Sequence, residues 1–83
     1  MINMTNSEKK NILKFVYDID IKMDEAIEKR DAAMSRNDEH CAAVCEQYHT
    51  NLSFQLNGIQ NALHALGYKL VDDNGFWKIE RRT

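Results

Sequence analysis

The sequence predicts a mainly α-helical chain of the α+β class, with an antiparallel two-helix hairpin followed by a C-terminal two-stranded β-hairpin. Three observations predict it. Apolar residues recur at three- and four-residue spacing over two long segments. A polar break separates these segments, and after Gly67 the spacing changes to two around an Asn-Gly pair. We expect one domain over residues 1–83, with helices at about 6–35 and 38–66 and the β-hairpin at about 68–81.

The first helix is expected to begin at a capping box. In Thr5-Asn6-Ser7-Glu8, the Thr hydroxyl and the Glu carboxylate can each accept a hydrogen bond from the other residue's backbone N–H. No Gly or Pro interrupts the segment that follows. Its apolar stripe comprises Ile12, Val16, Ile19, Met23, Ala26, Ile27, Ala33 and Met34.

A strand is the alternative for residues 12–23. Apolar and polar residues also alternate from Leu13 to Met23, and alternation is typical of a strand. We prefer the helix because the capping box precedes this segment, and no turn residue separates it from the helical pattern of residues 25–34.

The second helix is expected to follow a polar turn at residues 35–38. Asn37 or Asp38 can cap it by accepting hydrogen bonds from its first free N–H groups. The helix is expected to end at Gly67, because glycine readily adopts the left-handed conformation found after helix C-termini. Its apolar stripe, which would share one seam with the first helix, comprises Cys41, Cys45, Tyr48, Leu52, Leu56, Ile59, Leu63 and Leu66.

The C-terminal segment has the pattern of a β-hairpin. Asn74-Gly75 fits a type I′ turn, which needs positive φ at both positions. Pairing around this turn places Leu70 opposite Ile79, Asp72 opposite Trp77, and Lys69 opposite Glu80. An isolated two-stranded hairpin is marginally stable, so its apolar face should pack on the helices or on another chain.

The outer face of the second helix predicts an interaction surface. No Lys or Arg occurs between Arg36 and Lys69, although a solvated helix normally carries charges of both signs. Small residues allow close helix approach, and depletion of charge is typical of an interface core. We therefore expect self-association through Phe54, Gly58 and Ala65; the alternative is a neutral solvated face. The whole face comprises Ala43, Gln47, Thr50, Phe54, Gly58, Asn61 and Ala65.

A second apolar ridge lies on the first helix. Leu13, Tyr17 and Ile21 are spaced at four residues, well away from the main stripe. Either the C-terminal hairpin covers this ridge, or a second protein molecule does, with Trp77 as a further candidate contact. A chain this short usually needs additional stabilisation, so a homo-oligomer is expected and a dimer is favoured.

Motifs for catalysis or metal binding are weak in this sequence. Cys41, Cys45 and His49 lie on successive helical turns, but structural zinc normally takes four ligands from spaced pairs. Buried thiols are the preferred interpretation. There is no Gly-rich phosphate loop and no nucleophile elbow. We expect neither an enzyme, nor a metal site, nor a cofactor.

Charge and hydropathy restrict the partner class further. The net charge is −2, which argues against a dedicated nucleic-acid binder. Lys69, Lys78, Arg81 and Arg82 nevertheless cluster near the C-terminus, and Lys9, Lys10 and Lys14 lie near the N-terminus. No apolar stretch approaches the roughly 20 residues that span a bilayer, and no secretion signal follows Met1, so a cytoplasmic location is expected.

The functional hypothesis is a small non-enzymatic protein-binding module of the inhibitor or adaptor type. It would dock on another protein and self-associate through the uncharged face of the second helix. The alternative is nucleic-acid or nucleotide binding, with Lys69, Lys78, Arg81 and Arg82 as phosphate contacts.

Overall fold

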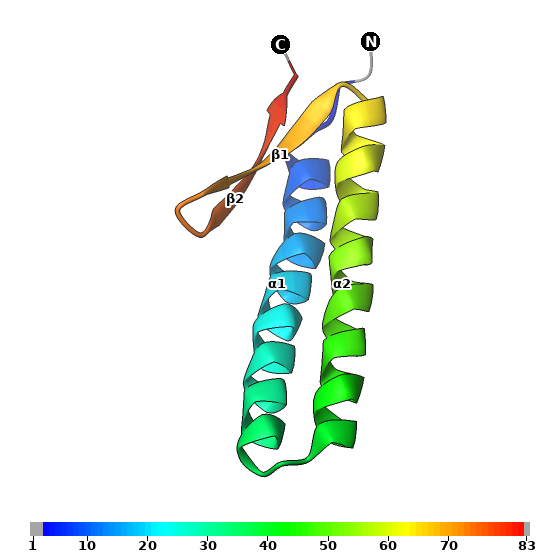
Figure 1. Ribbon diagram of the computed structural model, residues 1–83. Coiled ribbons are helices and arrows are strands. Elements are labelled where there is room, and N and C mark those ends of the chain that lie inside the picture. Colours follow the sequence, from blue (N-terminus) through cyan, green and yellow to red (C-terminus); the bar gives the residue numbers. More distant parts are fainter. Residues whose placement is uncertain (1–2, 83) are drawn as a thin grey trace.

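The computed structural model describes residues 3–82. Its elements are α1 (Asn6–Ser35), α2 (Glu39–Ala65), β1 (Tyr68–Asp73) and β2 (Phe76–Arg81). The two helices run antiparallel, and the β-hairpin lies across the end of the helix pair where α1 begins and α2 ends (Figure 1). The molecule is elongated, with extents of 52 × 20 × 19 Å. The helical hairpin followed by a β-hairpin is therefore confirmed.

Helix α1 begins at the expected capping box. The Thr5 hydroxyl accepts a hydrogen bond from the Glu8 N–H at 3.0 Å. The Glu8 carboxylate accepts one from the Thr5 N–H, also at 3.0 Å, and this bond holds the pKa of Glu8 below its ordinary value. The helix continues without a break to Ser35, so the strand alternative for residues 12–23 is wrong.

The connection between the helices uses two of the expected turn residues. Asn37 adopts a positive φ of 59°, a conformation that Asn tolerates better than most residues. The Asp38 side chain caps α2 by accepting a hydrogen bond from the Cys41 N–H at 3.1 Å. At the other end of α2, Gly67 has a φ of 86°, as expected for a residue that follows a helix C-terminus.

The β-hairpin has the expected register and turn. Leu70 pairs with Ile79, Asp72 with Trp77, and Lys69 with Glu80. Both turn residues have positive φ, 54° at Asn74 and 90° at Gly75. The Asp72 carboxylate also accepts a hydrogen bond from the Gly75 N–H at 3.0 Å.

Replacing Asn74 and Gly75 together with alanine should weaken the hairpin, because alanine at positive φ costs about 1–2 kcal/mol per residue. We expect the free energy of unfolding in urea to fall by about 2 kcal/mol while the helical circular dichroism before the transition is unchanged. An unaltered urea midpoint would show that the turn geometry does not contribute to stability.

The hydrophobic core lies where the hairpin crosses the helices. Its buried cluster combines Val16 of α1, Leu63 of α2, Tyr68 and Leu70 of β1, and Ile79 of β2. All four elements therefore meet in one cluster, which fixes the position of the hairpin.

Farther from the hairpin, the seam between the helices buries small residues, namely Ala26, Ala33 and Ala42. The stripes predicted from the sequence are too wide here. Met34 and Tyr48 were expected on the seam but are exposed, and so is Leu66 at the hairpin end of α2. Each helix has a single helical neighbour in this part of the molecule, so only a narrow strip of each stripe is covered.

Candidate interaction surfaces

The outer face of α2, as defined by its seven residues above, is open along its whole length. All seven residues are exposed, and Phe54 at the middle of the face is 67% exposed. An ideal Cβ placed on Gly58 would meet no heavy atom within 4 Å, so the backbone there is open to close approach. Phe54, Gly58 and Ala65 are therefore all at the surface of the described chain.

This face carries no formal charge. Between His40 and Ala65 the sequence contains a single Asp, Glu, Lys or Arg, which is Glu46. Glu46 lies near the seam instead, where its carboxylate is 3.8 Å from the Arg30 guanidinium of α1. The remaining polar groups on the face are neutral amides and a hydroxyl, which lose less solvation energy than charges do when a partner covers them.

A second surface, which we call the apolar groove, runs between the helices. Its volume is about 340 Å³, and it is lined by Ile12, Phe15, Ile59, Ala62, Leu63 and Leu66. Phe15 is 68% exposed, and none of the residues that line the groove is charged. The sequence interpretation missed Phe15 as a surface residue, although its place about 100° from Val16 around the helix was a usable signal.

The Leu13–Tyr17–Ile21 ridge of α1 divides into covered and exposed parts. The Tyr17 hydroxyl accepts a hydrogen bond from the Trp77 N–H at 2.9 Å. Leu13 and Trp77 both pack against the core cluster. Ile21 is exposed. The hairpin therefore covers Leu13 and Tyr17, one of the two alternatives considered for this ridge, and leaves Ile21 uncovered.

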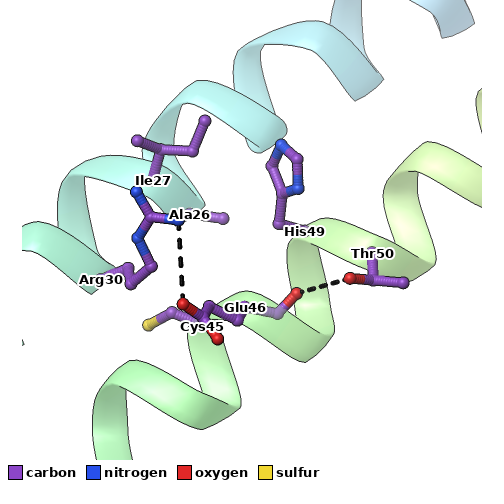
Figure 2. Close-up of a pocket in the computed structure, with 7 residues that line it drawn as sticks. All are labelled: Ala26, Ile27, Arg30, Cys45, Glu46, His49 and Thr50. Carbon is purple, nitrogen blue, oxygen red and sulfur yellow. Dashed lines mark hydrogen bonds and ion pairs between the residues drawn. The ribbon is translucent and has the colours of Figure 1, made fainter.

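A shallow polar pocket lies across the seam in the half of the helix pair nearer the interhelical turn (Figure 2). Arg30 reaches from α1 toward Glu46 of α2, and the Thr50 hydroxyl donates to the Glu46 backbone carbonyl at 3.0 Å. His49 and Cys45 also line the pocket. The ion pair is largely exposed, so its contribution to stability is small.

The Cys45 thiol is poorly suited to nucleophilic chemistry. Cys41 and Cys45 are free and half-buried. Partial burial raises the pKa of Cys45, and the adjacent Cys41 raises it further, so the unreactive protonated form is favoured. Within residues 3–82, no three His, Cys, Asp or Glu side chains come together in a way that could hold a metal ion.

The basic residues from the two ends of the chain meet at Tyr68. The Lys9 ammonium lies 5.4 Å from the centre of the Tyr68 ring, and the Arg81 guanidinium lies 5.3 Å from it. Arg81 also donates to the Tyr68 hydroxyl and to the Asn3 side chain.

The other basic residues of the hairpin are partly engaged. Lys78 is paired with Asp73 at 3.0 Å, and this contact raises the pKa of the lysine. Arg82 donates to the His64 backbone carbonyl at 3.2 Å. Much of the predicted phosphate-binding cluster therefore makes contacts within the chain.

No family model, curated protein or solved structure matches this chain. None of the helices in the described part of the chain is long and apolar enough to cross a membrane. The geometry of the surfaces is therefore the basis for the functional proposal.

Proposed function

We propose that this chain is a small non-enzymatic protein-binding module of the inhibitor or adaptor type, which self-associates and docks on another protein. One observation carries the proposal. The outer face of α2 is exposed along its whole length and has no charged residue, although it belongs to a chain in which 29% of residues are charged. Such a face is depleted of charge in the way that interface cores are.

The outer face of α2 has the features needed for self-association. Phe54 offers a large aromatic surface, and aromatic residues are enriched among the contacts that dominate binding energy. Ala65 and Gly58 lie on the same face and allow a second helix to approach closely. In a two-fold dimer the same face serves both copies, so its neutrality avoids like-charge repulsion.

The apolar groove is the complementary surface for docking. An amphipathic helix of another protein can insert its apolar face into a groove of this kind, with anchors at helical spacing. The groove and the outer face of α2 share no residue. Self-association and docking can therefore take place on one chain at the same time.

Replacing Phe54 with glutamate tests the self-association surface. Phe15→Glu is the matched control, because Phe15 is 68% exposed and Phe54 is 67% exposed, and the two residues lie on different surfaces. We expect Phe54→Glu to lower the solution mass measured by light scattering, since it places a charge in the contact. Phe15→Glu should leave the mass unchanged, and both variants should keep the helical circular dichroism.

Two outcomes would contradict this proposal. If Phe54→Glu had the same solution mass as the natural protein, the outer face of α2 would not be the interface. An equal loss of mass in both variants would show that added charge acts through general repulsion and not through a contact at Phe54.

The alternative function is nucleic-acid or nucleotide binding near Tyr68. One observation favours it, because Lys9 and Arg81 converge on the Tyr68 ring from opposite ends of the chain. Phosphate binding would weaken steeply with added salt. Titration with single- and double-stranded oligonucleotides at two salt concentrations separates this alternative from docking on an apolar surface.

A further inference from the structure

The outer edge of β1 has unpaired backbone groups whose positions follow from the register. The sheet has two strands, so each strand has one edge without a neighbouring strand. Arg82 N–H donates to the Gly67 carbonyl at 2.9 Å, which makes this a hydrogen-bonded pair. Bonded pairs alternate with non-bonded pairs in an antiparallel ladder. The backbone groups of Leu70 and Asp72 therefore point away from β2.

The backbone N–H of Trp77 gives an independent check of this alternation. Trp77 pairs with Asp72, so its N–H must also point away from the partner strand. It does so, because it donates to the Tyr17 hydroxyl at 2.9 Å. Helix α1 therefore covers the edge of β2 at this point.

The edge of β1 makes no equivalent hydrogen bond to a helix in the described residues. Within residues 3–82, no hydrogen bond outside the strand pairing involves the backbone of Leu70 or Asp72. The tip of the hairpin projects past α1, as Figure 1 shows. The pairing is continuous from Tyr68 to Asp73, so no bulge interrupts the edge, and the chain contains no proline. A regular edge whose outward backbone groups have no hydrogen-bond partner is a template for another strand.

We propose that β1 pairs in antiparallel fashion with β1 of a second copy of this chain, with Val71 on the two-fold axis. In this register, Leu70 lies opposite Asp72 of the second copy. These are the residues whose backbone groups point outward, so both pairs are hydrogen-bonded. The result is a four-stranded antiparallel sheet in place of two marginal two-stranded ones.

Charge complementarity selects this register. With Val71 on the axis, Lys69 of each copy lies opposite Asp73 of the other, and the sheet gains two pairs of opposite charge. Lys69 forms no ion pair in the described part of the chain, and Asp73 holds Lys78 through Oδ2, which leaves its other oxygen for a second cation. An axis through Leu70 would instead place Lys69 opposite Val71, without any opposite-charge pair.

The β1 contact is independent of the outer face of α2. The two surfaces share no residue, so either contact can form when the other does not. If both form, two different two-fold contacts on one chain join copies into assemblies larger than a dimer. The Phe54→Glu variant would then retain the β1 contact alone.

Cysteine cross-linking tests the proposed contact directly. With Val71 on the axis, the Val71 residues of the two copies form a non-hydrogen-bonded pair, and their Cα atoms lie about 4.5 Å apart. This separation lies within the range of about 4.4–6.8 Å that a disulfide requires. Val71→Cys should therefore form a disulfide-linked dimer rapidly under mild oxidation, as seen on a non-reducing gel.

Two controls accompany this variant. Phe76→Cys places a thiol at an exposed position on β2, away from the axis, and should cross-link slowly. The natural chain shows the background from Cys41 and Cys45, which are half-buried. Equal rates for Val71→Cys and Phe76→Cys would overturn the proposal.

Charge reversal tests the register. Two further variants are made in the Val71→Cys background, one with Lys69→Asp and one with Asp73→Lys. In a dimer of either variant, both 69–73 pairs carry like charges. Each change should therefore slow cross-linking about tenfold. An equimolar mixture of the two variants restores both opposite-charge pairs, but only between unlike chains. We expect mass spectrometry to find mainly mixed dimers at a recovered rate.

The mixture also shows whether slower cross-linking comes from lost contacts between copies or from a damaged hairpin. Asp73→Lys removes the pairing with Lys78, whereas Lys69→Asp leaves it intact. If slower cross-linking reflected a damaged hairpin, mixing would not restore the rate. A mixture as slow as its components would therefore overturn the proposed register.

Discussion

Replacing Leu63 with alanine is expected to lower the free energy of unfolding by about 2–5 kcal/mol. Leu63 is 2% exposed and lies in the cluster that joins both helices to both strands. A chain of this length has a total stability of about 4–12 kcal/mol, so the loss is a large part of the whole. Urea unfolding followed by circular dichroism measures it.

The matched control is Leu66→Ala, one turn farther along the chain. Leu66 is 38% exposed and lies at the rim of the apolar groove, so the same truncation should cost less than about 1 kcal/mol. Trp77 fluorescence should report the same urea midpoint as the helical signal in Leu63→Ala, because one cluster joins the two parts. Equal losses in the two alanine variants, or separate midpoints, would contradict this description of the core.

Replacing Tyr68 with alanine should cost about 3–5 kcal/mol, by analogy with truncation of other buried aromatic residues. Tyr68 is 2% exposed, and Lys9 and Arg81 lie against its ring. Its hydroxyl accepts a hydrogen bond from the Met4 N–H at 2.9 Å and another from Arg81 at 3.3 Å. The residue therefore ties both ends of the chain to the core.

Tyr68→Phe separates the ring from the hydroxyl. It keeps the buried ring and removes the acceptor of two hydrogen bonds, so we expect a loss of only about 1–2 kcal/mol. Urea unfolding of both variants checks the order. A loss in Tyr68→Phe as large as that in Tyr68→Ala would assign the stability to the hydroxyl contacts and not to burial of the ring.

The helix and strand boundaries could be predicted because their signals are local. The capping box of Thr5 and Glu8 satisfies backbone groups within one turn. Gly67, Asn74 and Gly75 adopt positive φ, which few other residue types tolerate. These preferences act through the adjacent backbone, so the sequence alone indicates them correctly.

The way the hairpin packs on the helices could not be predicted in the same way. Leu13 and Phe15 lie on opposite flanks of the α1 stripe, and both are apolar. The direction in which the chain leaves Gly67 decides that Leu13 is covered while Phe15 remains exposed. Which flank of α1 is covered depends on how all four elements pack, and it cannot be predicted from the periodicity of one helix.

The candidate surfaces were predictable to different degrees. The exposure of Phe54 and Gly58 follows from the helical wheel of a two-helix hairpin, because no element within residues 3–82 covers the outer face of α2. The apolar groove could not be predicted from the pattern of either helix, since it combines residues from both. The meeting of Lys9 and Arg81 at Tyr68 joins positions far apart in the sequence, and no local pattern indicates it.

Light scattering of the natural protein and of Phe54→Glu at low and high salt tests the central claim, which is self-association through the uncharged outer face of α2; Phe54→Glu should have the smaller mass. For the natural protein we expect the mass of a dimer or a larger assembly that persists at high salt, because a neutral apolar contact is little affected by screening. A monomer at every protein concentration and at both salt concentrations would contradict the account.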